Sequence, residues 1–439
     1  MLALLGGNPV RSDPYPAWPV FDETEVDAVA DVVRTGEWGR LGSHRVIAFE
    51  RAFAEFQGAA YGLAVNSGTS ALEMGLEALR LPRGSEVILA PFTFMASATS
   101  ILNAGLVPVF ADIDPETYNL DPACVAAAIT PRTSAIMAVH FGGLACDMQA
   151  ILDIASANDL RVIEDAAHSH AGTWCDQGLG TIGDVGCFSF QASKNLNSGE
   201  GGAVLTDDID IFSRAIAQHD LWGGGVEQRG GQLGRGSLAT GEGWDFTVSA
   251  GDRRITPFQA TLLQAQLGRL EDQAQRRAAN GAYLNDLLED LEGIGVRRID
   301  AFATRPAHHV YVFRYQAAAF KGLSRERFIE AMNAEGIPVT KGYRQPLHRT
   351  ALFGDVDGAL ARAWPRGDGA PDIDYADVSC PHAERLCADE TLFLTQSVLL
   401  DDEVGMVQIA DAIEKVREHA EALMAADDAA TPRSDPPSA

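Results

Sequence analysis

Short apolar runs alternate with amphipathic stretches through the first half of the chain. Two of these stretches, 70–79 and 148–159, repeat their apolar residues at the spacing of a helix. Six runs have the length and composition of buried strands: 61–65, 86–90, 107–111, 135–139, 161–165 and 187–190. This alternation predicts a mainly parallel sheet covered by helices on both faces, with ligands at the carboxyl ends of its strands.

The second half of the chain has a different pattern. A long helical stretch begins near residue 257 and leads to a strand-like run at 310–316 and an amphipathic helix at 325–336. We expect three parts: a large α/β domain over 1–260, a smaller α+β domain over 261–425 and a disordered tail over 426–439. The glycine-rich stretch 223–243 is predicted to be a long loop that could cover a site as a lid, and 355–375 an insertion loop.

Composition and charge narrow the class of protein. Hydrophobic residues make up 46% and charged residues 22% of the 439, which suits a folded protein. No apolar run has the length of a transmembrane helix, and the N-terminus lacks the basic stretch of a signal peptide, so a cytoplasmic location is expected. The net charge of -27 argues against nucleic acid or an anionic membrane as a partner, and it indicates either solubility or adaptation to salt.

Metal binding is not expected. The six cysteines form no C-x-x-C pair and fit scattered thiols of a reducing compartment. His168 and His170 could share a strand face, and His308 is followed by His309, but neither pair has obvious further ligands.

Three motifs contain residues that could bind a ligand or take part in a reaction, and each follows a predicted strand. The first, VNSGTSALEMGL, opens a helix with four small residues: Ser67, Gly68, Thr69 and Ser70. Free N–H groups and the helix dipole attract an anion there, although an ordinary helix cap has the same residues. The second, VIEDAAHSHAG, ends a strand with Glu164 and Asp165, where a carboxylate can pair with a cationic ligand atom or cap a helix. His168 follows, and by itself it favours a buried core histidine.

The third motif, SFQASKNLNSGEGG, contains Lys194, one of four lysines in the chain. Arginine is permanently protonated and cannot form a Schiff base with an aldehyde, whereas a lysine of lowered pKa can. An anion site, a carboxylate and a lysine match the phosphate, the ring nitrogen and the aldehyde of pyridoxal 5′-phosphate (PLP). Phe94, in the stretch PFTFMAS, could supply an aromatic face for the PLP ring.

These motifs resemble those of the DegT/DnrJ/EryC1/StrS aminotransferases, the sugar aminotransferase family among PLP enzymes of fold type I. The matching stretches are NSGTSAL (66–72), PFTF (91–94), GLVPVFADIDPETYNLDP (105–122), VIEDAAHSHAG (162–172), FSFQASKNLNSGEGG (188–202), ITPFQA (255–260) and EGIPV…YRQPLH (335–348). The resemblance implies a seven-stranded, mainly parallel sheet domain with a smaller C-terminal α+β domain. It also implies a homodimer with its active sites at the interface.

The resemblance assigns roles to individual residues. Lys194 would hold PLP as a Schiff base and shuttle a proton, and Asp165 would pair with the pyridine nitrogen. The other cofactor contacts would be His168 at the phenolic oxygen, Phe94 on the ring, and Gly68, Thr69, Ser70 and Ser189 at the phosphate. Tyr343, Arg344 and His348 are candidates either for substrate contact or for structural roles. Asp252 stands where many relatives have an asparagine that reaches the neighbouring subunit's phosphate, and it would repel that phosphate unless it points away or Arg253 replaces it.

The predicted reaction moves an amino group from glutamine or glutamate to a ring ketone. The wording S-F-Q-x-S-K around Lys194 resembles the inosose and aminoshikimate branch of the family, which favours a cyclitol or carbasugar ketone in aminocyclitol or secondary-metabolite biosynthesis. A nucleotide-linked keto-sugar is the alternative substrate. A PLP-binding regulatory protein without turnover also stays open, and only Asp252 favours it. Lys194 favours transamination, because some family members with histidine at its position are sugar dehydratases.

Overall fold

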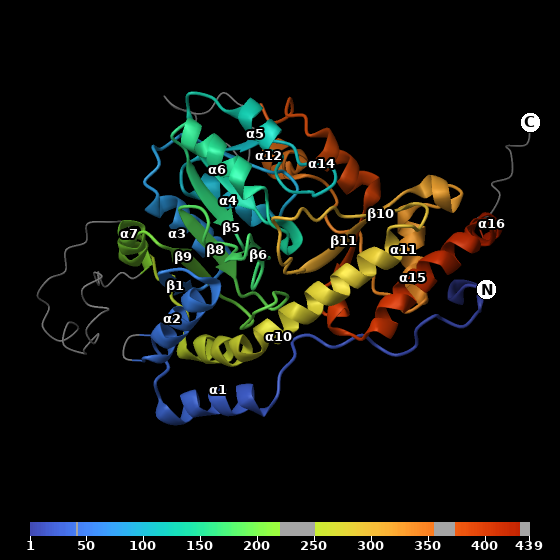
Figure 1. Cartoon of the computed structure of the whole chain (residues 1–439), viewed down its shortest axis with the longest axis horizontal. Coiled ribbons are helices and arrows are strands. Elements are labelled where there is room, and N and C mark those ends of the chain that lie inside the picture. The colour runs from blue at the N-terminus through green and yellow to red at the C-terminus, as the bar shows by residue number, and fades with distance from the viewer. Residues whose placement is uncertain (41–42, 220–250, 355–373, 431–439) are drawn as a thin grey trace, which may run out of the picture.

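The computed structural model describes residues 1–40, 43–219, 251–354 and 374–430 (Figure 1). A seven-stranded sheet has the order β1-β9-β8-β5-β4-β2-β3. Its strands are β1 (Tyr61–Val65), β2 (Glu86–Leu89), β3 (Val107–Phe110), β4 (Thr133–Val139), β5 (Arg161–Asp165), β8 (Val185–Ser189) and β9 (Gly202–Thr206). Strand β9 pairs antiparallel with β1 and β8, and all other neighbours are parallel. The predicted mainly parallel seven-stranded sheet is confirmed, and β9 is a strand that the apolar pattern did not indicate.

Helices cover both faces of this sheet, as Figure 1 shows. Those before residue 220 are α1 (Glu23–Thr35), α2 (Arg45–Gln57), α3 (Gly68–Ala78), α4 (Met95–Asn103), α5 (Pro122–Ala128), α6 (Met148–Ala157) and α7 (Ile209–His219). Side chains alternate along a strand, so β1 contributes to two cores. Leu63 and Val65 pack in the cluster that contains α3, whereas Ala64 packs with Phe49 and Phe53 of α2.

The C-terminal region builds a second core. Its antiparallel sheet consists of β10 (Ile294–Val296), β11 (Val310–Tyr315) and β12 (Thr391–Thr395). Earlier in the chain, β6 (Thr173–Trp174) and β7 (Gln177–Gly178) form a separate two-stranded hairpin. The helices α12 (Ala351–Gly354) and α14 (Pro381–Arg385) pack in the core of the large sheet, whereas α11 (Arg325–Ala334), α15 (Glu403–Glu418) and α16 (Ala420–Ala430) pack in the C-terminal core. Leu2 and the partly buried Val10 and Tyr15 also pack here, so the N-terminal segment belongs to this core.

One helix, α10 (Pro257–Leu288), runs through both cores over 32 residues (Figure 1, yellow). Thr256 and Gln259 form a capping box at its start, which satisfies free N–H groups of the first turn. Leu263 and Leu270 pack beside α2, whereas Leu284 and Leu288 pack in the C-terminal core. The predicted domain boundary at residue 260 therefore lies inside a continuous helix, and the division into domains stays a prediction.

Several predicted segments lie wholly or partly outside the described residues. They include the proposed lid at 223–243, residues 355–373 of the proposed insertion loop, and 431–439 of the tail. Helix α16 continues to Ala430, so the first residues of the predicted disordered tail are helical, because its alanine-rich sequence favours a helix. Among the described helices, none is long and apolar enough to cross a bilayer.

Candidate active site

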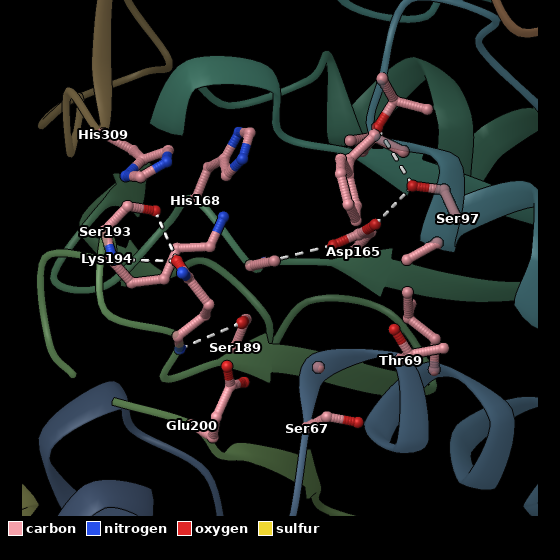
Figure 2. Close-up of a pocket in the computed structure, with 18 of the residues that line it drawn as sticks. Ser67, Thr69, Ser97, Asp165, His168, Ser189, Ser193, Lys194, Glu200 and His309 are labelled. Atoms are coloured by element: carbon pink, nitrogen blue, oxygen red, sulfur yellow. Dashed lines mark hydrogen bonds between the residues drawn. The ribbon is translucent and has the colours of Figure 1, made fainter. Parts of the chain in front are cut away.

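A cavity of about 480 Å³ lies at the carboxyl ends of β5 and β8, beside the N-termini of α3 and α4 (Figure 2). Eight of the residues expected at the site line it: Gly68, Thr69, Phe94, Asp165, His168, Ser189, Lys194 and Tyr343. Seven come from the ends of sheet strands or the loops and helices that follow them, and Tyr343 comes from the C-terminal region. The fold therefore brings three separate motifs to one cavity.

The N-terminus of α3 forms one end of the cavity. Ser67 caps this helix, because its Oγ accepts the Ser70 N–H at 3.1 Å and its hydroxyl donates to Ser70 Oγ at 3.0 Å. The N–H groups of Gly68 and Thr69 have no intrahelical partner at this position. Since they lie at the positive end of the helix dipole, this end of the cavity can bind a phosphate.

Close packing requires glycine at position 68. A Cβ atom there would lie 2.7 Å from Ser189 Cβ, well inside contact distance. Without that atom, the start of α3 and the end of β8 come together, so Ser189 joins the phosphate-binding end. Ser189 Oγ accepts the Gln191 N–H at 3.3 Å, which leaves its own hydrogen free for a ligand.

Hydrogen bonds fix the loop that carries the lysine. Gln191 Oε1 accepts the Ser193 N–H at 2.9 Å and the Ser193 hydroxyl at 2.7 Å. The indole N–H of Trp18 donates to Ala192 O at 2.9 Å. The backbone N–H of Lys194 donates to Gln191 O at 2.8 Å, so the backbone at the lysine is held in place.

Lys194 is the nucleophile candidate of the cavity. Its side chain points into the cavity toward His168 (Figure 2). Burial lowers the pKa of Lys194 to about 8, although the charge of Asp165 opposes that shift. A substantial fraction of this amine is therefore neutral near pH 8, as attack on a carbonyl requires.

Asp165 is the carboxylate that faces the cavity. Its Oδ2 accepts the Ser97 hydroxyl at 2.7 Å, and its Oδ1 accepts the Ala167 N–H at 3.2 Å. Burial raises the pKa of Asp165 above its ordinary value, and the hydrogen bonds oppose this. A cation placed against the carboxylate would lower that pKa and keep the group ionised, which suits a protonated ring nitrogen.

Glu164 serves the fold instead, because consecutive strand residues face opposite sides of a sheet. Its carboxylate accepts three backbone N–H groups from the turn 180–183 at 2.6 to 2.7 Å. His140 Nδ1 accepts the Cys146 N–H, so the ring hydrogen lies on Nε2, which donates to Glu164 at 2.8 Å. Burial alone would raise the pKa of Glu164, but these bonds lower it.

His168 presents a neutral imidazole to the cavity. Its Nδ1 accepts the Gly142 N–H at 3.2 Å, so the hydrogen of the neutral ring lies on Nε2. Burial lowers the pKa of His168 well below its ordinary value, and the charge of Lys194 adds to this. The ring can therefore donate a hydrogen bond to an anionic oxygen without carrying a charge.

Three predicted contact residues do not line the cavity. Ser70 is engaged in the cap of α3. Arg344 is exposed, and His348 is buried with its Nε2 2.9 Å from Glu384 Oε1. Their cofactor and substrate contacts stay predictions that the geometry of this cavity does not support.

Asp252, at the position where many relatives have asparagine, also lies outside the cavity. Asp252 pairs with Arg254 at 2.8 Å, and Arg253 lies 3.5 Å from both Glu73 and Glu77 of α3. In the described chain, neither Asp252 nor Arg253 faces the phosphate-binding end.

Six further polar residues line the cavity and were not expected there: Thr93, Ser97, Gln191, Ser193, Glu200 and His309. Five of them lie inside the stretches PFTFMAS and SFQASKNLNSGEGG quoted above, so their closeness to Phe94 and Lys194 in the sequence was the available signal. His309 comes directly before β11, far from these stretches, so only the fold places it at the cavity. Within the described ranges, no group of three or more His, Cys, Asp or Glu residues could hold a metal ion.

A mainly parallel seven-stranded sheet, with a cavity at the carboxyl ends of its strands that contains a buried lysine, a carboxylate and a helix N-terminus, defines a PLP-dependent enzyme of fold type I. The model of the DegT/DnrJ/EryC1/StrS aminotransferase family matches residues 19–398, and the chain belongs to this family of PLP-dependent aminotransferases.

Relatives of known name agree with this assignment. The L-glutamine:2-deoxy-scyllo-inosose aminotransferase of Streptoalloteichus tenebrarius is 36% identical over 426 residues, which cover 95% of this chain and 98% of that protein. The 3-amino-5-hydroxybenzoate synthase of Amycolatopsis mediterranei is 32% identical over 92% of this chain and 98% of that protein. A crystal structure of 3-amino-5-hydroxybenzoic acid synthase matches with a TM-score of 0.79 at 31% identity, covering 93% of this chain and 100% of that one.

Proposed function

We propose that this aminotransferase moves the amino group of L-glutamine to a ring ketone of a cyclitol such as an inosose, in aminocyclitol or secondary-metabolite biosynthesis. One observation carries the proposal: Lys194, with its lowered pKa, and Asp165 face the same cavity. The name of the relative from Streptoalloteichus tenebrarius supports both the donor and the cyclitol ketone. Neither named relative reported above supports the alternative, a nucleotide-linked keto-sugar.

The residues of the cavity fit PLP. The N–H groups of Gly68 and Thr69, together with the hydroxyls of Thr69 and Ser189, would hold its phosphate. Asp165, kept in place by Ser97, would pair with the protonated ring nitrogen. Bound PLP supplies an electron sink that stabilises negative charge on the carbon that gains or loses a proton.

Lys194 would perform the proton transfer. Its amine, with a pKa of about 8, would carry a proton from the donor carbon to the cofactor in the first half-reaction, and from the cofactor to the acceptor carbon in the second. His168 would donate from Nε2 to the phenolic oxygen, and Phe94 would cover a face of the ring. Phe94 is 62% exposed in the single chain, so a ring stacked on it would bury apolar surface.

The lining also supports glutamine as the donor. The charged side chains among the described lining residues are Asp165, Lys194 and Glu200, because the histidines are neutral. Glutamate would bring a second carboxylate into a cavity whose described lining has no arginine to pair with it. The neutral carboxamide of glutamine avoids that repulsion.

Tyr343 is the best placed of the predicted substrate contacts. Its ring packs edge-on against Phe92 at a centroid distance of 5.5 Å and lies 5.9 Å from Phe141. Burial raises the pKa of Tyr343, so its hydroxyl stays protonated and can donate to a substrate oxygen. Arg344 and His348 would need a different arrangement of their loop to reach the same substrate.

We also propose a homodimer in the cytoplasm. Several large apolar side chains on and beside α1 are exposed, which fits a surface covered by a second copy: Phe21, Val26, Val33 and Trp38. All six cysteines are free, which fits a reducing compartment. Light scattering coupled to size-exclusion chromatography tests the dimer, and a monomer at micromolar concentration would contradict it.

Visible absorption tests the reaction. L-Glutamine should abolish the yellow absorption of the PLP-loaded protein, and 2-deoxy-scyllo-inosose should then restore it. Lys194→Ala should show neither change, whereas Lys341→Ala, a control outside the cavity, should behave as the wild type. Bleaching by L-glutamate alone would refute the donor. Restoration by a nucleotide-linked keto-sugar, but by no cyclitol ketone, would refute the acceptor.

A further inference from the structure

His309 enters the cavity from the C-terminal region and has no assigned role. Three hydrogen bonds clamp the segment that carries it. The N–H groups of Ala307 and His309 donate to the carbonyls of Gly143 and Gly142 at 2.8 and 3.0 Å. The side-chain amide of Asn195, the residue after Lys194, donates to Ala307 O at 2.7 Å. The segment is thus tied both to the lysine loop and to the turn that orients His168.

The backbone before His309 adopts an uncommon conformation. His308 has a φ of 47°, in the left-handed region that residues with a side chain rarely adopt. Its imidazole is buried against α10, where a Cβ atom at Gly281 would lie 2.4 Å from His308 Nε2. A strained conformation that several contacts maintain is typical of a functional position. Its effect here is to direct His309 into the cavity.

The ring of His309 lies against that of His168, with centroids 4.3 Å apart and planes inclined by 33° (Figure 2). His309 Nδ1 is buried without a hydrogen-bond partner among the described residues. A buried N–H without an acceptor is rarer than a bare acceptor, so the hydrogen of the neutral ring belongs on Nε2. That N–H also finds no acceptor among the described residues, and the lining position of His309 makes it available to a ligand.

We propose that His309 is a specificity-determining residue that donates its Nε2 hydrogen to a ring hydroxyl of the ketone substrate. This inference rests on the proposed function and names a contact within it. A hydroxyl oxygen suits a neutral N–H donor, whereas a phosphate would favour a cation. Burial lowers the pKa of His309 well below its ordinary value, and the charge of Lys194 adds to this, so the ring stays neutral.

Two substitutions separate substrate contact from ring packing. His309→Phe keeps an aromatic ring against His168 but removes the N–H, whereas His309→Gln keeps a donor near the Nε2 position but removes the ring. The two half-reactions are followed separately by the absorption of the PLP-loaded protein, first with L-glutamine and then with 2-deoxy-scyllo-inosose. Thermal unfolding and the initial absorption spectrum report whether each variant is folded and loaded.

We expect His309→Phe to raise the half-saturating ketone concentration about tenfold, the effect of one lost hydrogen bond of about 1.4 kcal/mol. The half-saturating concentration of L-glutamine should rise much less, and His309→Gln should recover most of the ketone affinity. An unchanged ketone concentration in His309→Phe would overturn the proposal. A second outcome would also overturn it: His309→Phe binds the ketone as the wild type does, whereas His309→Gln binds it weakly and has an altered initial spectrum. In that case His309 would act by positioning His168. A wild-type protein that reacts with L-glutamine but with no cyclitol ketone would instead refute the proposed acceptor itself, and the contact with it.

Discussion

Ser97 and Asp165, 68 positions apart in the chain, are joined by a hydrogen bond of 2.7 Å inside the candidate active site. Ser97 must donate, because the carboxylate can only accept, and Thr93, 3.0 Å from the Ser97 oxygen, must then donate to Ser97. The hydroxyls of Thr93 and Ser97, at and just before the start of α4, therefore form a hydrogen-bonded chain that ends at the Asp165 carboxylate. This contact fixes the direction of Asp165 before any ligand binds.

Removal of that contact should weaken cofactor binding. Ser97→Ala takes one donor from a buried carboxylate, which costs about 1.5 kcal/mol, or roughly tenfold in the PLP dissociation constant. Titration of the apoprotein with PLP, followed by absorbance, measures this. Ser100→Ala is the control, since Ser100 lies on the same helix and donates to Ser97 O outside the cavity. Equal losses in the two variants would mean that α4 itself had been disturbed.

The pKa of Lys194 predicts how PLP attachment depends on pH. The charged lysine is disfavoured by burial, so the neutral amine becomes the main form above a pH of about 8, well below the ordinary value of 10.5. The rate of PLP attachment to the apoprotein should rise with pH through a midpoint near 8 and then level off. Stopped-flow absorbance measures this rate. A rate that keeps rising to pH 10 would show that Lys194 is not desolvated.

Two glycines should respond to alanine in opposite directions. Gly68→Ala places a Cβ atom 2.7 Å from Ser189 Cβ, so we expect a cost of about 1–3 kcal/mol and weaker PLP binding. Gly268→Ala, in the exposed middle of α10 with open space around it, should stabilise the protein by about 1 kcal/mol. Thermal unfolding of both apoproteins measures the difference. A harmless Gly68→Ala would mean that α3 and β8 separate easily.

Substitutions of the two adjacent carboxylates on β5, Glu164 and Asp165, should affect stability and turnover respectively. Glu164→Gln sets an amide NH₂ against backbone N–H donors, so we expect a loss of about 2–3 kcal/mol in stability. Asp165→Asn should unfold almost as the wild type does but lose about a hundredfold or more in turnover, because a buried cation loses its partner. Chemical denaturation and steady-state assays measure the two effects. Equal effects of both variants on turnover would refute this division of roles.

The lowered pKa of Glu164 predicts how the stability of the protein depends on pH. The pKa of Glu164 is lowered in the folded protein, so its contribution to stability is present above the unfolded value of 4.5 and is lost as the pH falls below it. The stability gap between the wild type and Glu164→Gln should therefore narrow as the pH falls from 5 toward 3. A gap that stays constant over this range would show that Glu164 is not ionised in the folded protein.

The sequence identified those features of the fold and the site that depend on residues close together in the chain. Apolar runs located six of the seven strands of the large sheet, and the motifs around Gly68, Asp165 and Lys194 named groups that the fold brings together. Local pattern could not decide between Glu164 and Asp165. It shows that consecutive strand residues face opposite sides, but the side that holds the cavity depends on the order of strands in the sheet.

Residues that reach the cavity from elsewhere were missed for the same reason. His309 adjoins the site only because the segment 307–309 binds the turn at 142–143. His348 lies close to Tyr343 in the sequence, yet it is held by Glu384 outside the cavity. Strand β9 begins at Gly202, the last residue of the glycine-rich lysine motif, so only the three apolar residues 203–205 mark it in the sequence.

Helix α10 also constrains how substrates enter and leave. A continuous helix of 32 residues spans roughly 48 Å, and a hinge motion between the two cores would have to bend or break it. Arg277 and Asn280, in its C-terminal half, donate to Gln396 Oε1 and to Leu399 O, so this half is tied to the segment that follows β12. Within the described part of the chain, the two cores should therefore move as one body while donor and acceptor enter and leave.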